Sequence, residues 1–296
     1  MVTTLKKERP ISAQDIEWHL SISKRVAEPH ASAMVIRLNS TYLELVDGVY
    51  SNRGAMSQIG LIFIFAMLSM LVSDFAGNSP WWNLLISAVF SGLMVSFALF
   101  CMWKIGEWFG FTHYPIRLNR INRTVYVFRR DGTILSARWD DLYFALRVNS
   151  RAAGFCTVGI CGLVLKDSKT VEEMFVFGYA STSRENCLRH WEFIRRYMEE
   201  GPRAVLNVPG LGLYLPIADK RETLYEGWIE LVSNDAWNPV FKWLMFPFHV
   251  LFFIGRLVNR VTSKVPMWPA DVEAACRIEP GDPYVRDSSL NPPGYR

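Results

Sequence analysis

Histidine, cysteine and carboxylate side chains supply most metal ligands and acid–base catalysts, and in this chain of 296 residues they are dispersed. A metal site needs several ligands within one coordination sphere, so the sequence predicts no metal site. The histidines are His19, His30, His113, His190 and His249. The cysteines are Cys101, Cys156, Cys161, Cys187 and Cys276. An odd number of scattered thiols without a CxxC pair is typical of a reducing compartment.

Three local combinations of reactive residues are better explained by structure than by chemistry. Cys156 and Cys161 lie five residues apart in an apolar stretch, so a strand places them on opposite faces, and we predict buried core thiols. Asp140 and Asp141 are adjacent, which favours a turn between strands over a catalytic carboxylate pair. His190 has no nucleophile near it in sequence, and we predict a histidine on a helix surface.

The sequence motifs of common enzyme classes are missing as well. There is no GxSxG nucleophile elbow and no GxxxxGK[ST] phosphate loop. The Gly210-Leu211-Gly212 stretch is too short for a dinucleotide fingerprint. We therefore predict no catalytic residue, no cofactor and a non-enzymatic protein. A membrane enzyme with an unrecognised carboxylate or histidine site stays open as an alternative.

One basic cluster remains as a candidate binding site, on two predicted strands and the turn between them. Its members are Arg117, Arg120, Arg123, Arg129 and Arg130. Arginines so placed can bind lipid phosphates or an acidic partner. The alternative is that they are solvated strand ends on the cytoplasmic side. Nucleic acid is excluded as a partner, because 32 Lys+Arg against 28 Asp+Glu leave only +4 and the nearby aromatics alternate like core residues.

Half of the chain is hydrophobic, its mean hydropathy is +0.11, and the excess is local. The stretches 56–73 and 81–103 contain no charged residue. As helices they are roughly 27 and 35 Å long, enough to cross a hydrocarbon core of about 30 Å. We predict two transmembrane helices. A pair of buried core helices is the alternative.

The short link 74–80, DFAGNSP, makes the two predicted helices an antiparallel hairpin. Small residues recur every fourth position at Ala88, Gly92 and Ser96, a spacing that allows close helix approach, although ordinary small-residue content explains it equally well. Trp81, Trp82, Trp103 and Trp108 lie near the predicted membrane ends, as interfacial aromatics do.

Positive charge predicts the orientation of the hairpin. Its connecting loop carries no Lys or Arg, whereas both flanks do. The flanking residues are Lys6, Lys7, Arg9, Lys24, Arg25, Arg37 and Arg53 before the hairpin, and Lys104, Arg117, Arg120 and Arg123 after it. Because cytoplasmic segments are enriched in Lys and Arg, both termini are expected in the cytoplasm of a multi-pass membrane protein. The N-terminus does not resemble a cleavable signal peptide.

The predicted fold class is α+β: the transmembrane hairpin, an antiparallel β-barrel or sheet capped by a helix, and C-terminal helices. A helix is predicted over 12–28, starting at Ser12 with Asp15 as capping partner, and two strands over 33–50 that join the later sheet. Further expected elements are strands at 115–119, 124–130, 133–139, 142–148, 155–165 and 171–178 and a helix at 183–200. Asp131-Gly132 predicts a hairpin turn.

Six short strands followed by a helix, over about 114–200, resemble a pleckstrin-homology-like barrel. The resemblance lies in the pattern, and Trp191 fits the aromatic that plugs such a barrel. A sandwich or another α+β sheet is the competing fold.

The C-terminal part holds a third apolar stretch, 240–258, after an apolar, glycine-broken segment at 203–215 and a predicted helix at 219–233. Lys242, His249 and Arg256 recur every seven residues, so a helix would carry them in one stripe, joined by Arg260. This favours a helix in the head-group plane, with Lys242 and Arg256 available to lipid or a partner. A buried core helix and a third span are the alternatives.

We predict five consecutive segments along the chain. They are a cytoplasmic N-terminal segment (1–55), the hairpin (56–103), a β-rich cytoplasmic domain (104–202), a helical segment (203–266) and a polar tail (267–296) that is extended or mobile.

The layout resembles an uncharacterised family of bacterial two-span inner-membrane proteins. The stretches RLNRINRTVYVFRRDGTILSARWDDL (117–142) and GLGLYLPIADKRETLYEGWIELVSN (210–234) carry the resemblance. Such proteins are often associated with type VI secretion and contact-dependent toxin loci, as immunity or accessory factors. The resemblance implies a membrane-anchored binding protein whose partners are the bilayer and a toxin or secretion component, with a homo-oligomer as a further option. A module that senses lipid head groups is the alternative.

Overall fold

A computed structural model of the chain describes residues 4–48, 50, 53–77, 79–105, 108–152, 155–233 and 239–292. Its strands form where apolar residues alternate with polar ones. The N-terminal part has β1 (Thr4–Pro10), α1 (Ala13–Glu17), β2 (His19–Leu20), β3 (Val35–Leu38) and β4 (Tyr42–Leu45). The middle part has α2 (Ala55–Ala76), α3 (Trp81–Ile105), β5 (Ile116–Asn119), β6 (Thr124–Phe128), β7 (Ile134–Arg138), η1 (Trp139–Asp141), β8 (Tyr143–Ala152), β9 (Phe155–Leu165) and β10 (Thr170–Ser181). The last part has α4 (Arg184–Glu200), η2 (Pro202–Ala204), α5 (Leu224–Ser233), α6 (Pro239–Thr262), α7 (Ala270–Ala275) and η3 (Ser288–Leu290).

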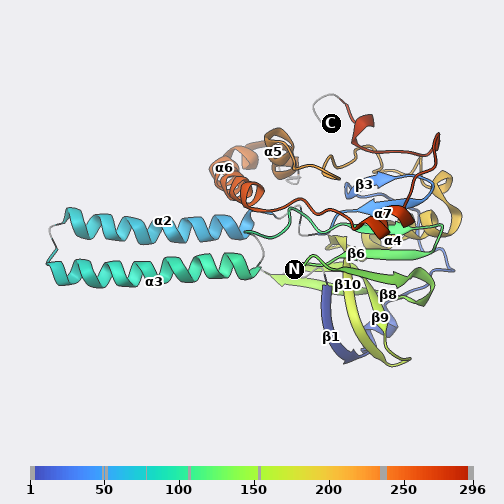
Figure 1. The fold of residues 1–296 in the computed structure, drawn as a ribbon, viewed down its shortest axis with the longest axis horizontal. Helices are drawn as coiled ribbons and strands as arrows, with labels where there is room; N and C mark the ends of the chain where they lie inside the picture. The colour runs from blue at the N-terminus through green and yellow to red at the C-terminus, as the bar shows by residue number, and fades with distance from the viewer. Residues whose placement is uncertain are drawn as a thin grey trace. The chain divides into compact units, whose positions relative to one another are not determined.

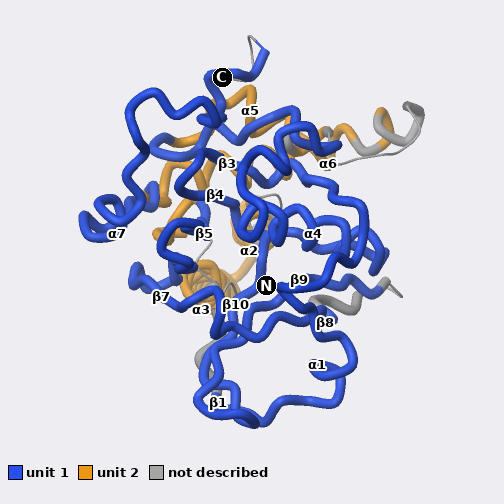
Figure 2. Tube along the Cα trace, turned by 90° about the vertical axis from the view of Figure 1, so that its right-hand side faces the viewer, with its two compact units in different colours: residues 1–50, 113–220, 265–296 blue, residues 51–112, 221–264 orange. Residues whose placement is uncertain are grey.

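The chain divides into two compact units, each built from separate stretches of sequence (Figure 2). Unit 1 comprises Met1–Tyr50, His113–Lys220 and Val265–Arg296. Unit 2 comprises Ser51–Thr112 and Arg221–Lys264. The division into five consecutive segments stays a prediction. The two compact units divide the chain differently, because each combines stretches that are far apart in sequence.

Unit 1 contains two five-stranded antiparallel sheets in the described ranges, with strand orders β1-β10-β9-β8-β2 and β3-β4-β5-β6-β7. The α+β class is confirmed, and so is the pairing of the strands at 33–50 with the later sheet, because β4 pairs with β5. The six strands expected to form one barrel divide three and three between the sheets. Gly132 takes a positive φ of 85° in the tight turn between β6 and β7, as Asp131-Gly132 predicts.

One hydrophobic core joins both sheets to α4. Trp191 of α4 is fully buried there, stacked on Trp139 at 5.7 Å between ring centroids and 4.7 Å from Phe144. The apolar face of α4 therefore packs on the core, and Trp191 lies within it, as the amphipathic pattern predicts.

The predicted length of the N-terminal helix is wrong. The capping box of Ser12 and Asp15 is present, but α1 stops at Glu17 because His19 and Leu20 pair with β8. The tail, predicted to be extended or mobile, is bonded to the β3–β4 turn and to β3 in its described part. Ser40 donates to Asp282 through its backbone N and its Oγ, both at 2.8 Å, and the backbone of Leu38 bridges to Arg286.

Unit 2 contains the predicted hairpin, in which α2 and α3 lie side by side (Figure 1). Both helices are long and apolar enough to cross a membrane. Their contact face carries Gly60, over which Met102 packs, and Ser91, whose Oγ donates to the carbonyl of Met67 at 3.3 Å. Ala88, Gly92 and Ser96 lie on the exposed side of α3, so these small residues are not in the contact between α3 and α2.

Most apolar side chains of the hairpin are exposed. Examples are Phe65, Val72, Phe75 (77% exposed), Trp81, Leu93 and Phe97. Buried core helices, the alternative to membrane spans, would hide these side chains. One of the four predicted interfacial tryptophans differs: Trp108 is buried, and its Nε1 donates to Ser57 Oγ at 2.8 Å.

Candidate functional site

Arg117, the first of the predicted binding arginines, is 1% exposed. It lies on β5 directly opposite Glu44 of β4, and its Nη2 donates to Glu44 Oε1 at 3.2 Å. Its guanidinium lies between the rings of Tyr42, at 4.4 Å, and Trp268, at 4.9 Å. Nη1 is 3.1 Å from Glu273 Oε1, an ion-pair contact without hydrogen-bond geometry. Burial alone would lower the pKa of Arg117, but the surrounding negative groups, Glu44 foremost, raise it.

These contacts attach the start of the C-terminal tail to the sheet. Trp268 also donates from Nε1 to Glu44 Oε1 at 2.5 Å, and α7 follows it. A charged cross-strand pair thus becomes a buried site that the tail covers. Arg117 is a structural residue in this arrangement, with its guanidinium enclosed by the chain itself.

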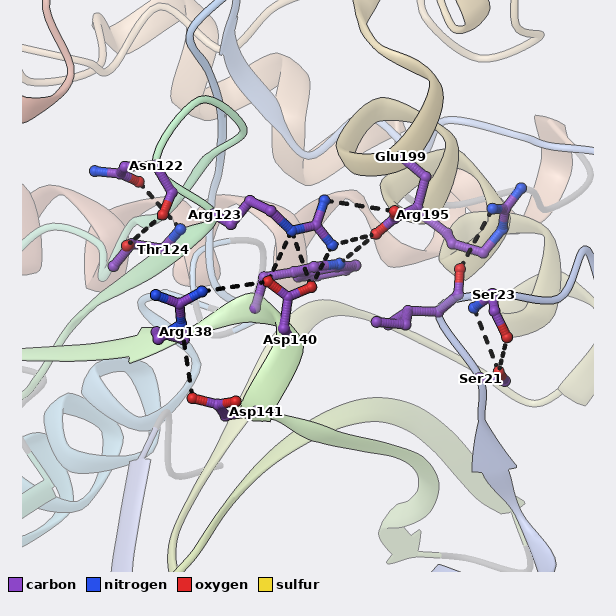
Figure 3. A network of polar contacts seen from close by, with 12 residues as sticks. Ser21, Ser23, Asn122, Arg123, Thr124, Arg138, Asp140, Asp141, Arg195 and Glu199 are labelled. Atoms are coloured by element: carbon purple, nitrogen blue, oxygen red, sulfur yellow. Dashed lines mark hydrogen bonds and ion pairs between the residues drawn. The ribbon is translucent and has the colours of Figure 1, made fainter.

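Arg123 lies at the centre of a second polar network (Figure 3). Its guanidinium donates to Asp140 at 2.9 and 2.8 Å and to Glu199 of α4 at 2.9 Å, while Trp139 Nε1 donates to Glu199 at 2.7 Å. The hydrogen bonds from Arg123 lower the pKa of Asp140. Arg123 has a left-handed φ of 53°, which suits the turn before β6. The network fastens α4 to the turn and to η1.

Arg120 and Arg129 are also engaged within the chain. Arg120 donates to the carbonyl of Ser40 at 3.2 Å, and Arg129 makes a two-pronged ion pair with Glu173 of β10 at 2.6 and 2.8 Å. Arg130 is half-buried, and no polar partner of its side chain is found in the described part of the chain. Binding by the five arginines stays a prediction. In this structure four of them make contacts that hold elements of the fold together.

The two predicted site residues on α6 have different outcomes. Lys242 lies on α6 with its side chain outside the described residues. Arg256 is 2% exposed and donates to Glu222 at 2.7 and 2.6 Å. Arg260 donates to the Glu222 carbonyl at 2.7 Å. Arg256 and Arg260 of the predicted polar stripe therefore bind Glu222 within the chain, and they hold the segment before α5 against α6.

The other reactive residues follow local geometry. Cys156 is exposed and Cys161 buried, so the prediction of opposite faces is confirmed and the prediction of a buried Cys156 is wrong. Burial raises the pKa of Cys161 to about 12, which makes its thiol unreactive. Asp140 and Asp141 lie in the η1 turn as predicted. No cluster of three metal-ligating side chains occurs among the described residues.

His190 does not lie on a helix surface, contrary to the prediction. It is 1% exposed, packed 4.9 Å from the ring of Tyr179, and its Nδ1 has no hydrogen-bond partner. Burial lowers its pKa to about 3, so the ring is neutral. The neighbouring stretch of α4 turns one face toward the core, and the seven-residue spacing of its apolar residues could have shown that His190 shares this face.

A second arginine set, which the sequence analysis did not single out, lines a groove of about 330 Å³ in unit 1. It consists of Arg189 and Arg196 on α4 and Arg203 on η2. The spacing of seven residues was the available signal, because it places side chains on one face of a helix. Glu28, Pro29, Asn207 and Pro209 complete most of the lining.

Comparison with known proteins gives one match. Residues 91–280 match the model of a family described as a family of unknown function, DUF6708. No curated protein and no solved structure matches the chain. The matched region includes β5 to β10, α4 and α6, and it covers more than half of the chain. The chain therefore belongs to the DUF6708 family.

Proposed function

We propose that this protein is a non-enzymatic binding protein anchored in a bacterial inner membrane by the α2–α3 hairpin. The observation that carries the proposal is the exposed apolar surface along both helices. Water would leave this surface unfavourably hydrated, whereas lipid would cover it. The backbone of both helices is hydrogen-bonded internally, as a membrane span requires.

The α6 helix supports the same anchor. Its apolar side chains from Trp243 (78% exposed) to Ile254 are largely uncovered, which does not fit a buried core helix. Its later part crosses the first turn of α2, where Gly255 lies against the carbonyl of Gly54 and the backbone N of Gln58 (Figure 1). A helix that crosses the base of a spanning hairpin would lie in the head-group plane, with Trp243 and its neighbours in the acyl boundary.

The second part of the proposal is a protein partner for unit 1. Its two antiparallel sheets and α4 share a hydrophobic core, which supports a stable surface for a partner. The specific role we propose is immunity or accessory function in a toxin or type VI secretion locus, with both termini in the cytoplasm. The lipid-sensing alternative loses support, because most of the arginines it requires are paired within the chain.

Cysteine labelling in cells tests the anchor and its orientation. Ser79→Cys lies in the hairpin link, and the exposed Cys156 lies in unit 1. With the outer membrane permeabilised, a membrane-impermeant maleimide should label Ser79→Cys in intact cells and label Cys156 only after lysis. The Cys156→Ser variant is the control for background labelling. Labelling of Cys156 in intact cells would contradict the orientation, and release of the protein by carbonate extraction would contradict the anchor.

The immunity role needs a separate test. Deletion of the gene should make cells sensitive to the toxin encoded beside it, and the full chain should protect them on re-expression. A variant that lacks residues 56–103 separates anchoring from binding. If the deletion strain resists every toxin encoded beside the gene, the immunity role is wrong even if the anchor is right.

A further inference from the structure

The groove on α4 has a charge pattern that the proposed function does not use. Arg189 and Arg196 are about 10.5 Å apart along the helix axis and on one face, and Arg203 of η2, after the end of α4, lines the same groove. All three side chains line one groove of about 330 Å³, within the size range of small-ligand sites. Arginine forks are well suited to anions because their donors match planar or tetrahedral oxygen groups.

Two of the three arginines are uncompensated. In the described part of the chain, no hydrogen bond or ion pair is made by the side chains of Arg189 and Arg203. Arg189 is half-buried, so part of its hydration is already lost. A guanidinium in a groove without a polar partner keeps its donors available to an anion.

The third arginine is held in position. Arg196 Nε donates to the fully buried Glu192 at 2.8 Å, which leaves its terminal nitrogens at the groove. One of them lies 3.7 Å from Glu28 Oε2, longer than a hydrogen bond, and the Glu28 side chain is 85% exposed. Glu28 therefore acts as a weak resident carboxylate that a stronger anion would displace.

We propose that this groove binds a ligand through its phosphate groups. The three guanidiniums carry three positive charges and many N–H donors. One carboxylate has a single negative charge and two oxygens, so it would satisfy only part of this set. A phosphate monoester carries about −1.5 to −2 charges and three acceptor oxygens at pH 7, which matches this set. The inference is independent of the membrane anchor and of any toxin partner.

Calorimetric titration of the full chain in detergent with pyrophosphate tests the proposal. Pyrophosphate should bind more tightly than inorganic phosphate. Arg189→Gln and Arg203→Gln should each weaken binding about tenfold, because each removes charge-assisted hydrogen bonds. Neither side chain has a hydrogen bond or ion pair with a described residue, and both substitutions leave the backbone bond from His30 N to the Arg189 carbonyl in place, so both variants should fold normally. Arg277→Gln, which changes an exposed arginine outside the groove, is the matched control and should bind as the native chain does. Glu28→Gln should bind more tightly.

Several outcomes would overturn the proposal. They are equal affinity in Arg189→Gln and the native chain, no pyrophosphate binding at millimolar concentration, and a hexaglutamate peptide that binds as tightly as pyrophosphate. Nanodiscs identify the source of the phosphate. If a lipid head group occupies the groove, pyrophosphate should bind more weakly in discs with phosphatidic acid than in phosphatidylcholine discs, and Arg189→Gln should remove the difference. Equal binding in both discs means that the phosphate belongs to a soluble ligand.

Discussion

Replacing Arg117 by methionine should destabilise unit 1 strongly, because Glu44 would stay buried without its charge partner. Glu44 is 2% exposed, and Arg117 is its cross-strand neighbour. Breaking a buried ion pair by removing one partner costs about 3–5 kcal/mol. For a unit of this size that lowers the thermal midpoint by roughly 6–20 °C. The stacking of Arg117 between Tyr42 and Trp268 is lost as well, which places the effect toward the upper end.

The measurement is thermal unfolding of the full chain in detergent, followed by tryptophan fluorescence. Arg130→Met is the matched control: Arg130 lies in the same predicted cluster, and no described residue pairs with its side chain, so its midpoint should change by no more than about 2 °C. The double variant Arg117→Met with Glu44→Leu should recover part of the loss, because it leaves no buried charge unpaired, although Trp268 Nε1 loses its acceptor and the stacking is not restored. A midpoint for Arg117→Met close to that of the native chain would refute this reasoning and would favour Arg117 as a surface ligand for lipid or a partner.

Three further predictions concern a buried histidine, a close helix contact and an exposed network. The pKa of His190 is about 3 in the folded state and near 6.5 in the unfolded state, so the unfolded state binds the proton first as the pH falls. The free energy of unfolding should therefore be constant above pH 6.5 and lower by about 2 kcal/mol at pH 5. His190→Phe should flatten this dependence when unfolding is measured across that pH range. Gly255→Val should cost about 1–3 kcal/mol in a protease-resistance assay, because a Cβ there would lie 2.4 Å from the Gly54 carbonyl oxygen, whereas Gly92→Ala, with nothing within 4 Å, should be neutral. Arg123→Gln should lower the free energy of unfolding by only about 1 kcal/mol, since its network is partly exposed, and a larger loss by the same thermal assay would contradict that estimate.

The strands from 116 to 181 were predictable because their evidence is local. Two-residue alternation and the Asp131-Gly132 turn are properties of a few consecutive residues, and they do not depend on what packs against them. The boundary of α1 was not predictable in this way. The helical pattern continues beyond Glu17, but pairing of His19 and Leu20 with β8 ends the helix, and that partner lies more than a hundred residues away.

The arginine cluster shows the same limit for the candidate site. Arg117, Arg123 and Arg129 look like free surface charges when only their own strands are considered. Their carboxylate partners come from β4 and α7, from η1 and α4, and from β10. Charge density along a sequence therefore does not identify an anion site. The distinguishing property is a guanidinium that lines a groove and has no partner among the described residues, and Arg189 and Arg203 have it, whereas Arg130 has no described partner but does not line this groove.

The position of the hairpin in the chain also has a consequence for assembly. Adjacent strands β4 and β5 pair antiparallel, from Leu45 with Ile116 to Tyr42 with Asn119, although α2 and α3 lie between them in sequence. A flexible connection of this length would have to lose more chain entropy on closing than a short one. Because α2 and α3 lie side by side, the hairpin already brings its two ends together, so the effective loop shortens to about 20 residues and closure costs about 1 kcal/mol less. A formed hairpin therefore favours the strand pair that carries Glu44 and Arg117.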